Sequence, residues 1–234
     1  MILEAKYLKE QREDYNKLIN FLNEYYKIEI KNEVKNDLKL IHKVSWIIII
    51  WLRELKRNKI ESKFLNEILT NLISMIHVYI HNDIKLCNFI LRNSIENFIR
   101  FYNIYLSQID TASSPDKIFE IIFNKFNDNM CFINNNFQIL RSVYKECCDY
   151  IHSNNLDDEN FCKNLDQYDN FYDDKEITRF NNNFDNVHRA MNNLILLNSK
   201  MIYEQMYLNN KSIIDDFVNK DDMKKIIEVW RYKS

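Results

Sequence analysis

The chain contains no glycine and only one proline in 234 residues. About 16 glycines would be ordinary at this length. Phosphate-binding loops and strained nucleophile turns depend on glycine, so the sequence excludes P-loops, G-x-G-x-x-G dinucleotide loops and G-x-S-x-G nucleophile elbows. Tight β-hairpins of types I′ and II′ are also disfavoured. Asparagine, which tolerates the left-handed conformation, is expected to replace glycine at helix C-termini.

Apolar residues recur at intervals of three and four along most of the chain, which is typical of one face of an α-helix. We expect helices over about 5–26, 33–57, 62–81, 84–107, 115–126, 137–152, 177–208 and 221–232. Segment 46–52 is apolar on all sides, which predicts a place in the middle of a bundle. Ser114, Pro115 and Asp116 form a helix-start signal. The predicted fold class is therefore all-α, a bundle of seven to eight helices.

Composition divides the chain into four regions that we expect to form one compact unit. Residues 1–83 are N-terminal helices packed on a helical core at 84–153. An acidic loop at 154–176 follows, and residues 177–234 form the C-terminal helices. The asparagine-rich stretch at 124–136 is predicted to be a loop. Loops as long as the acidic one are uncommon inside compact domains and are either functional or disordered.

Charge and cysteine content limit the partners and the compartment. The formal net charge is −2, which argues against a general nucleic-acid coat. The five cysteines form an odd set without a C-x-x-C pair, as in a protein with reduced thiols. The longest apolar run, 46–52, is far shorter than the roughly 20 residues that span a bilayer. We therefore expect a soluble cytoplasmic protein with no membrane association.

Two segments contain residue types that can bind a metal ion, so metal binding has to be weighed for each of them. His77 and His81 lie one turn apart, so both rings could face one ion, with Asp83 nearby. The simpler interpretation is that these histidines flank an apolar stripe and make local hydrogen bonds. The acidic loop lacks the ligand order and the glycine of an EF-hand, so a solvated segment is the simpler interpretation there too. We expect no metal site and no cofactor.

Two helices carry the residues with the clearest chemistry. Arg92 and Glu96 share one face of the helix at 84–107, since they lie four residues apart. On the helix at 137–152, Lys145, Asp149 and His152 form a polar stripe. His152 ends this helix, where the helix dipole stabilises a charged imidazole. That position suits a general acid and equally an ordinary helix cap.

The segment LRNSIENFIRF at 91–101, followed by YKECCDYIHS at 144–153, resembles the HEPN superfamily of small helical bundles. It is most similar to HEPN-like bacterial proteins, some of them linked to defence against phage. The resemblance covers about residues 84–153 and implies a HEPN-like core. HEPN ribonucleases carry an Arg shortly before the His, where this chain has Glu146, Cys147 and Cys148. The resemblance also implies a homodimer, because HEPN active sites usually form across two subunits.

Two functions remain open on these grounds. The first is a helical interaction module, a subunit or regulator with a protein partner in a defence or toxin–antitoxin system, with RNA as an additional ligand. The second is a metal-independent endoribonuclease. In that case Arg92 would hold the phosphate, Glu96 would orient Arg92, and His152 would act as acid or base. The candidate binding residues are Arg141, Tyr144, Lys145 and Asp149.

Overall fold

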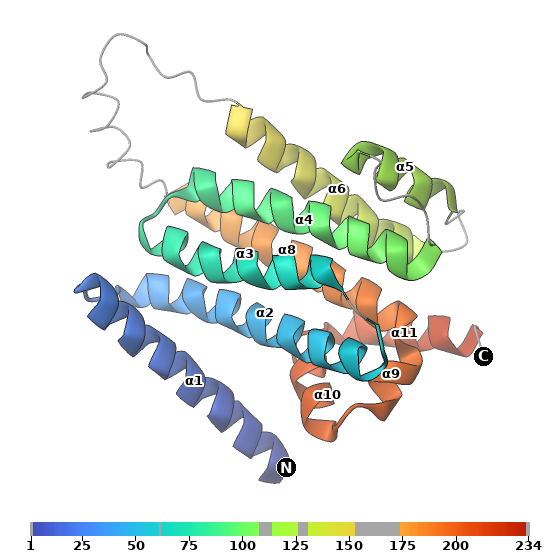
Figure 1. Ribbon diagram of the computed structural model, residues 1–234, viewed down its shortest axis with the longest axis horizontal. Coiled ribbons are helices and arrows are strands. Elements are labelled where there is room, and N and C mark those ends of the chain that lie inside the picture. Colours follow the sequence, from blue (N-terminus) through green and yellow to red (C-terminus); the bar gives the residue numbers. More distant parts are fainter. Residues whose placement is uncertain (1, 61, 108–113, 126–130, 153–173, 233–234) are drawn as a thin grey trace.

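The computed structural model describes residues 2–60, 62–107, 114–125, 131–152 and 174–232, and these form ten helices and no strand (Figure 1). The helices are α1 Ile2–Tyr26, α2 Asn32–Arg57, α3 Lys63–Ile80, α4 Ile84–Ser107, α5 Pro115–Lys125, α6 Cys131–His152, α8 Asp174–Asn198, α9 Lys200–Gln205, α10 Leu208–Asp215 and α11 Lys220–Tyr232. The all-α class is confirmed, with more helices than the seven to eight predicted. Most of the predicted acidic loop lies outside the described residues.

The long helices form a bundle with α8 packed between its neighbours (Figure 1). Helices α2, α3 and α4 follow one another side by side, with α1 beyond α2 at one edge and α5 and α6 at the other. Helix α8 contacts α2, α4, α6, α9 and α11. A single cluster of buried apolar side chains extends from Ile19 to Trp230. No helix in the described ranges is long and apolar enough to cross a membrane.

Helix α8 has a fully buried stretch, and its asparagines bind neighbouring helices. Every residue from 190 to 197 is buried. Asn192 accepts a hydrogen bond of 2.8 Å from the indole of Trp51 on α2, in the fully apolar segment predicted to lie centrally. Asn198 donates to the Tyr102 hydroxyl of α4 at 2.8 Å. Asn193 donates to Asn136 of α6 at 3.2 Å. Buried side-chain amides are usually hydrogen-bonded in native proteins, so these directional contacts help to fix how the helices pack.

Capping side chains and left-handed residues mark several helix boundaries. The Ser62 hydroxyl accepts a hydrogen bond of 3.1 Å from the Leu65 amide at the start of α3. Helix α5 begins at Pro115, as its proline predicts. The connections after α1, α2 and α3 each use a left-handed residue, namely Lys27, Lys59 and Asn82. Asparagine thus replaces glycine at one of the three C-termini, as predicted, but lysine does so at the other two.

The structure differs from the sequence prediction around two of the helices. Helix α6 begins at Cys131, inside the stretch predicted to be a loop. Ile133 and Asn136 of this stretch are buried, and tertiary packing of this kind overrides the low helix propensity of asparagine. The helix predicted over 177–208 ends at Asn198 and continues as two short helices, α9 and α10. These breaks allow Ile202 and Ile213 to turn back and be buried.

The buried His188 of α8 makes the stability of the fold depend on pH. Burial lowers the pKa of His188 to about 4, although the Phe184 carbonyl and Asp185 act in the opposite direction. Because the pKa in the unfolded chain is higher, near 6.5, this histidine costs no stability above pH 6.5, and stability is lost as the pH falls towards 4. The expected loss is about 3 kcal/mol over this range.

Urea unfolding of the wild type and a His188→Leu variant between these pH values measures this effect. The variant is expected to lose most of the acid slope, because no imidazole is left to be protonated on unfolding. An identical slope in both proteins would show that other groups cause the acid sensitivity.

Candidate functional site

The predicted Arg92–Glu96 pair lies at the contact between α4 and α6. The Nε and Nη2 atoms of Arg92 each lie 3.2 Å from Oε1 of Glu96. Tyr144 of α6 donates its hydroxyl to the same oxygen at 3.1 Å. The guanidinium carbon of Arg92 lies 5.6 Å from the centre of the Tyr144 ring. Three residues selected from the sequence are thus in contact, and we call them the Arg92 cluster.

Burial and mutual contact determine the protonation states in the Arg92 cluster. Burial raises the pKa of Tyr144 to about 12, and the charge of Glu96 acts in the same direction. Burial tends to lower the pKa of Arg92, but the contact with Tyr144 and the charge of Glu96 hold it above its ordinary value. At neutral pH the cluster therefore consists of a neutral phenol and a closed ion pair. Such a pair presents little net positive charge to a phosphate group.

His152 is the last residue of α6, and its side chain lies outside the described part of the structure. The two helices run antiparallel, since Tyr102 packs on Phe137 near one end and Cys147 contacts Asn88 near the other. His152 is thus about 12 Å further along the α6 axis than Tyr144. Because the helices are antiparallel, the His152 end of α6 lies towards the start of α4. Arg92 is bonded to Glu96, which lies towards the end of α4 and so away from His152.

The other candidate binding residues of α6 lie away from the Arg92 cluster. Arg141 places its guanidinium carbon 5.6 Å from the centre of the Phe123 ring of α5. Arg141 and Lys145 line a surface hollow of about 490 Å³ together with Phe123, and Arg92 is not part of this hollow. Asp149 is exposed. The four residues proposed for binding are therefore not gathered in one place. Arg141 and Lys145 line the hollow, Tyr144 lies next to Arg92, and Asp149 belongs to neither.

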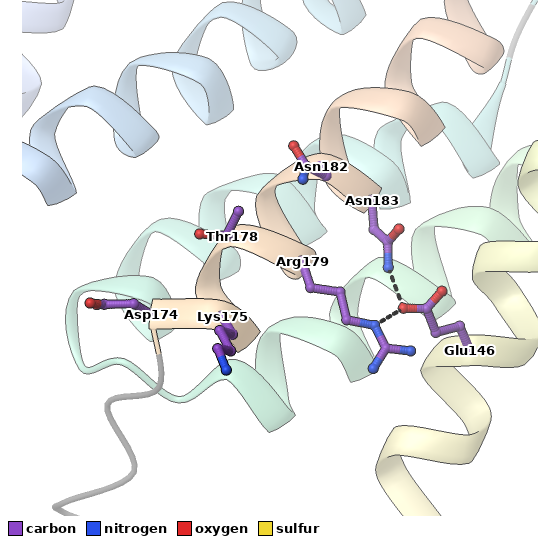
Figure 2. Close-up of a pocket in the computed structure, with 7 residues that line it drawn as sticks. All are labelled: Glu146, Asp174, Lys175, Thr178, Arg179, Asn182 and Asn183. Carbon is purple, nitrogen blue, oxygen red and sulfur yellow. Dashed lines mark hydrogen bonds and ion pairs between the residues drawn. The ribbon is translucent and has the colours of Figure 1, made fainter.

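A second polar hollow, between α6 and α8, is not apparent from the sequence (Figure 2). Figure 2 shows Arg179 and Asn183 of α8 directed towards Glu146 of α6. Arg179 forms an ion pair with Glu146, and Asn183 donates to the same oxygen at 2.9 Å. The hollow has a volume of about 580 Å³, and Lys175 and Thr178 are also among its lining residues. The sequence does show that Arg179 and Asn183 lie four residues apart on one helix face. This spacing does not identify Glu146 as their partner.

The Arg179–Glu146 contact closes the α6–α8 interface and does not form a catalytic arrangement. A catalytic site needs a nucleophile or acid–base group within hydrogen-bond reach of a second, orienting group. Here the Glu146 oxygen is already bonded to two donors, and the described residues of the lining include no histidine or cysteine. This hollow therefore contributes an interhelical contact, and its chemistry does not assign a reaction.

His77 and His81 both contact Tyr26 of α1. The Nδ1 atom of His77 lies 2.6 Å from the Tyr26 hydroxyl. The ring of His81 packs edge-on against Tyr26 with a centroid distance of 5.0 Å. His77 does make a hydrogen bond, but its partner belongs to another helix, so this bond is not the local one that was predicted. Within the described ranges, no group of three or more potential metal ligands is present.

Comparison of the chain with protein-family models, with curated proteins and with solved structures finds no match. The fold and the candidate sites are therefore interpreted from this chain's own contacts, and the HEPN-like core stays a prediction.

Removing Glu96 tests whether the Arg92 cluster stabilises the fold. In a Glu96→Ala variant, the Tyr144 hydroxyl loses its acceptor and Arg92 loses its ion pair in a part-buried place. We expect the free energy of unfolding in urea to fall by about 2 kcal/mol, because unpaired buried donors are costly. The matched control is Glu13→Ala, which removes an exposed pair with Lys9 on α1 and should change stability by less than about 0.5 kcal/mol. Equal losses in the two variants would contradict a special role for the cluster.

Proposed function

We propose that this protein is a non-enzymatic helical interaction module that binds a protein partner. Its resemblance to HEPN-like proteins suggests a subunit or regulator of a defence or toxin–antitoxin system. The observation that carries the proposal is an exposed apolar surface on the N-terminal helices, where large side chains face solvent. Large exposed apolar patches commonly mark interaction sites.

This surface is a groove lined by residues of α1, α2 and α3. We define the apolar groove by these lining residues: Leu18, Phe21, Trp46, Ile49, Leu69 and Ile73. The groove has a volume of about 400 Å³. Phe21 and Ile73 are each 52% exposed. Tyr25 extends the surface beyond the groove, since its ring stacks on Phe21 with the centroids 5.7 Å apart.

An amphipathic helix of a partner protein is the occupant that fits this groove best. The walls come from three helices, and apolar helices pack into the grooves between helical side-chain ridges. One acidic and one basic residue, Asp14 and Lys17, lie among the otherwise mainly apolar lining. Such a rim can pair with the polar edge of an amphipathic helix, while Phe21 and Ile73 contact its apolar face.

The geometry of the Arg92 cluster supports binding over catalysis. A ribonuclease of the HEPN type would need Arg92 to hold the scissile phosphate beside His152. Arg92 is instead bonded to Glu96 and stacked on Tyr144, and about two helical turns separate Tyr144 from His152. The alternative function therefore requires this ion pair to open before a phosphate can bind.

A cleavage assay distinguishes the two functions. Purified wild type, His152→Ala and Arg92→Gln are incubated with mixed cellular RNA in EDTA, and folding is matched by circular dichroism. We expect no cleavage by any of the three. Cleavage by the wild type that is lost in both variants would establish a metal-independent ribonuclease and overturn the proposal.

The groove is tested with substitutions at its rim. Proteins retained by the immobilised wild type are identified, and each is purified and titrated against wild type, Phe21→Glu, Ile73→Glu and Ile104→Glu. Ile104 is 42% exposed on α4, outside the groove, and serves as the control. We expect the two groove variants to weaken binding more than tenfold, as for buried apolar anchors, with no change in the control.

Equal binding by all four proteins would show that the partner lies elsewhere. Self-association of the wild type that is lost in Phe21→Glu would show that a second copy occupies the groove, in place of a partner helix. Sedimentation of the same variants without a partner measures this.

A further inference from the structure

A basic cleft lies between α1 and α2, at the point where the chain leaves α10. Its lining contains four Lys or Arg side chains and one carboxylate, together with polar residues and one histidine. The basic residues are Arg12, Lys35, Lys39 and Lys43, and the carboxylate is Asp216. The cleft has a volume of about 520 Å³, which is in the usual range of small-molecule sites. It shares no residue with the Arg92 cluster or with the hollow in Figure 2.

Among the described residues, the cations that line this cleft outnumber the carboxylates. Lys43 is paired with Asp216, with Nζ and Oδ2 2.6 Å apart. Arg12, Lys35 and Lys39 have no ion-pair partner within the described ranges. Lys35, Lys39 and Lys43 follow one another at single-turn spacing on α2, and like charges at that spacing destabilise a helix. An anion in the cleft would remove this repulsion.

Neutral groups in the cleft add hydrogen-bond donors. The side-chain amide nitrogen of Gln11 is buried and has no hydrogen-bond partner in the described structure. A buried donor without an acceptor is unusual in a native protein, and an oxygen atom of a ligand in the cleft would satisfy it. Tyr15 is held in place because its hydroxyl donates to the Lys35 carbonyl. Burial raises the pKa of Tyr15 to about 12, and Asp37 acts in the same direction, so the phenol stays neutral.

Three further charged or titratable groups near the cleft, His42, Asp14 and Asp37, already have hydrogen-bond partners. The His42 ring lies 2.9 Å from Oδ2 of Asp14, which also accepts a hydrogen bond of 3.0 Å from the Trp46 indole. Asp37 accepts a hydrogen bond of 2.7 Å from the Tyr79 hydroxyl of α3. Asp14 and Asp37 therefore have partners of their own, and neither forms an ion pair with Arg12, Lys35 or Lys39.

We propose that this cleft binds a ligand with adjacent phosphate groups, either the polyphosphate of a nucleotide or the backbone of a short RNA. The Cβ atoms of Lys35 and Lys39 are about 6 Å apart on one helix face, so their ammonium groups can contact neighbouring phosphates. Arg12 faces them from α1 and offers the planar pair of donors that suits phosphate oxygens. The site does not rest on the proposed function, because it shares no residue with the apolar groove except His42.

Calorimetric titration of the full chain tests the site. The probes are sodium tripolyphosphate, ATP without metal, and a short single-stranded RNA, each at low and at high salt. The cleft variant is Lys35→Gln with Lys39→Gln, and Arg12→Gln is a second variant from the other helix. The matched control is Lys31→Gln with Lys56→Gln, which removes the same charge from exposed positions outside the cleft. Circular dichroism checks that all of them fold alike.

We expect the wild type and the control to bind at least one probe, and both cleft variants to bind it at least tenfold more weakly. Similar binding of tripolyphosphate and ATP would show that phosphates alone are recognised, and binding of the RNA only would assign the ligand to an oligonucleotide. The proposal is overturned if no probe binds, or if the cleft variants and the control lose affinity equally, since the latter result means nonspecific attraction to positive charge.

Discussion

The hydrogen bonds made by the asparagines of α8 are the constraint on which the bundle depends. Asn192, Asn193 and Asn198 each bind a different surrounding helix, from a stretch of α8 that is almost wholly enclosed. An apolar side chain could pack in several ways, but a buried amide needs its partner at one distance and angle. The order of helices around α8 is therefore specified by directional contacts as well as by apolar packing. The Arg92 cluster is positioned by the same α4–α6–α8 arrangement.

Several charges at the helix contacts have a nearby partner of opposite sign. Examples are Arg92 and Glu96 on α4, and Arg179 and Glu146 between α8 and α6. These pairs connect helices or stabilise single turns, and their groups are occupied. The cleft between α1 and α2 differs from these contacts, because the cations in its described lining outnumber the carboxylates. We therefore propose a binding role for the cleft, where ion pairing is incomplete, and a structural role for the Arg92–Glu96 and Arg179–Glu146 pairs.

The sequence predicts local features well and long-range ones poorly. The contact between Arg92 and Glu96 was predictable because it joins residues four apart on one helix. The start of α5 followed from its proline. The Arg179–Glu146 pair and the basic cleft join residues from separate helices, and their encounter depends on packing that no local pattern encodes. The early start of α6 was missed for the same reason, since burial by neighbouring helices outweighs the weak helix propensity of its asparagines. The HEPN-like core remains a prediction.

The left-handed residues after α1, α2 and α3 bear on the unfolded chain as much as on the folded one. Lys27, Lys59 and Asn82 adopt a conformation that costs a residue with a Cβ atom about 1 kcal/mol. A chain with no glycine anywhere has fewer backbone conformations available before it folds, and each glycine avoided is worth up to about 1 kcal/mol of entropy. The fold therefore contains local backbone strain at three turns, while the unfolded chain has an unusually low conformational entropy. Part of the stability of the fold therefore comes from the backbone conformations that a chain without glycine cannot adopt when it is unfolded.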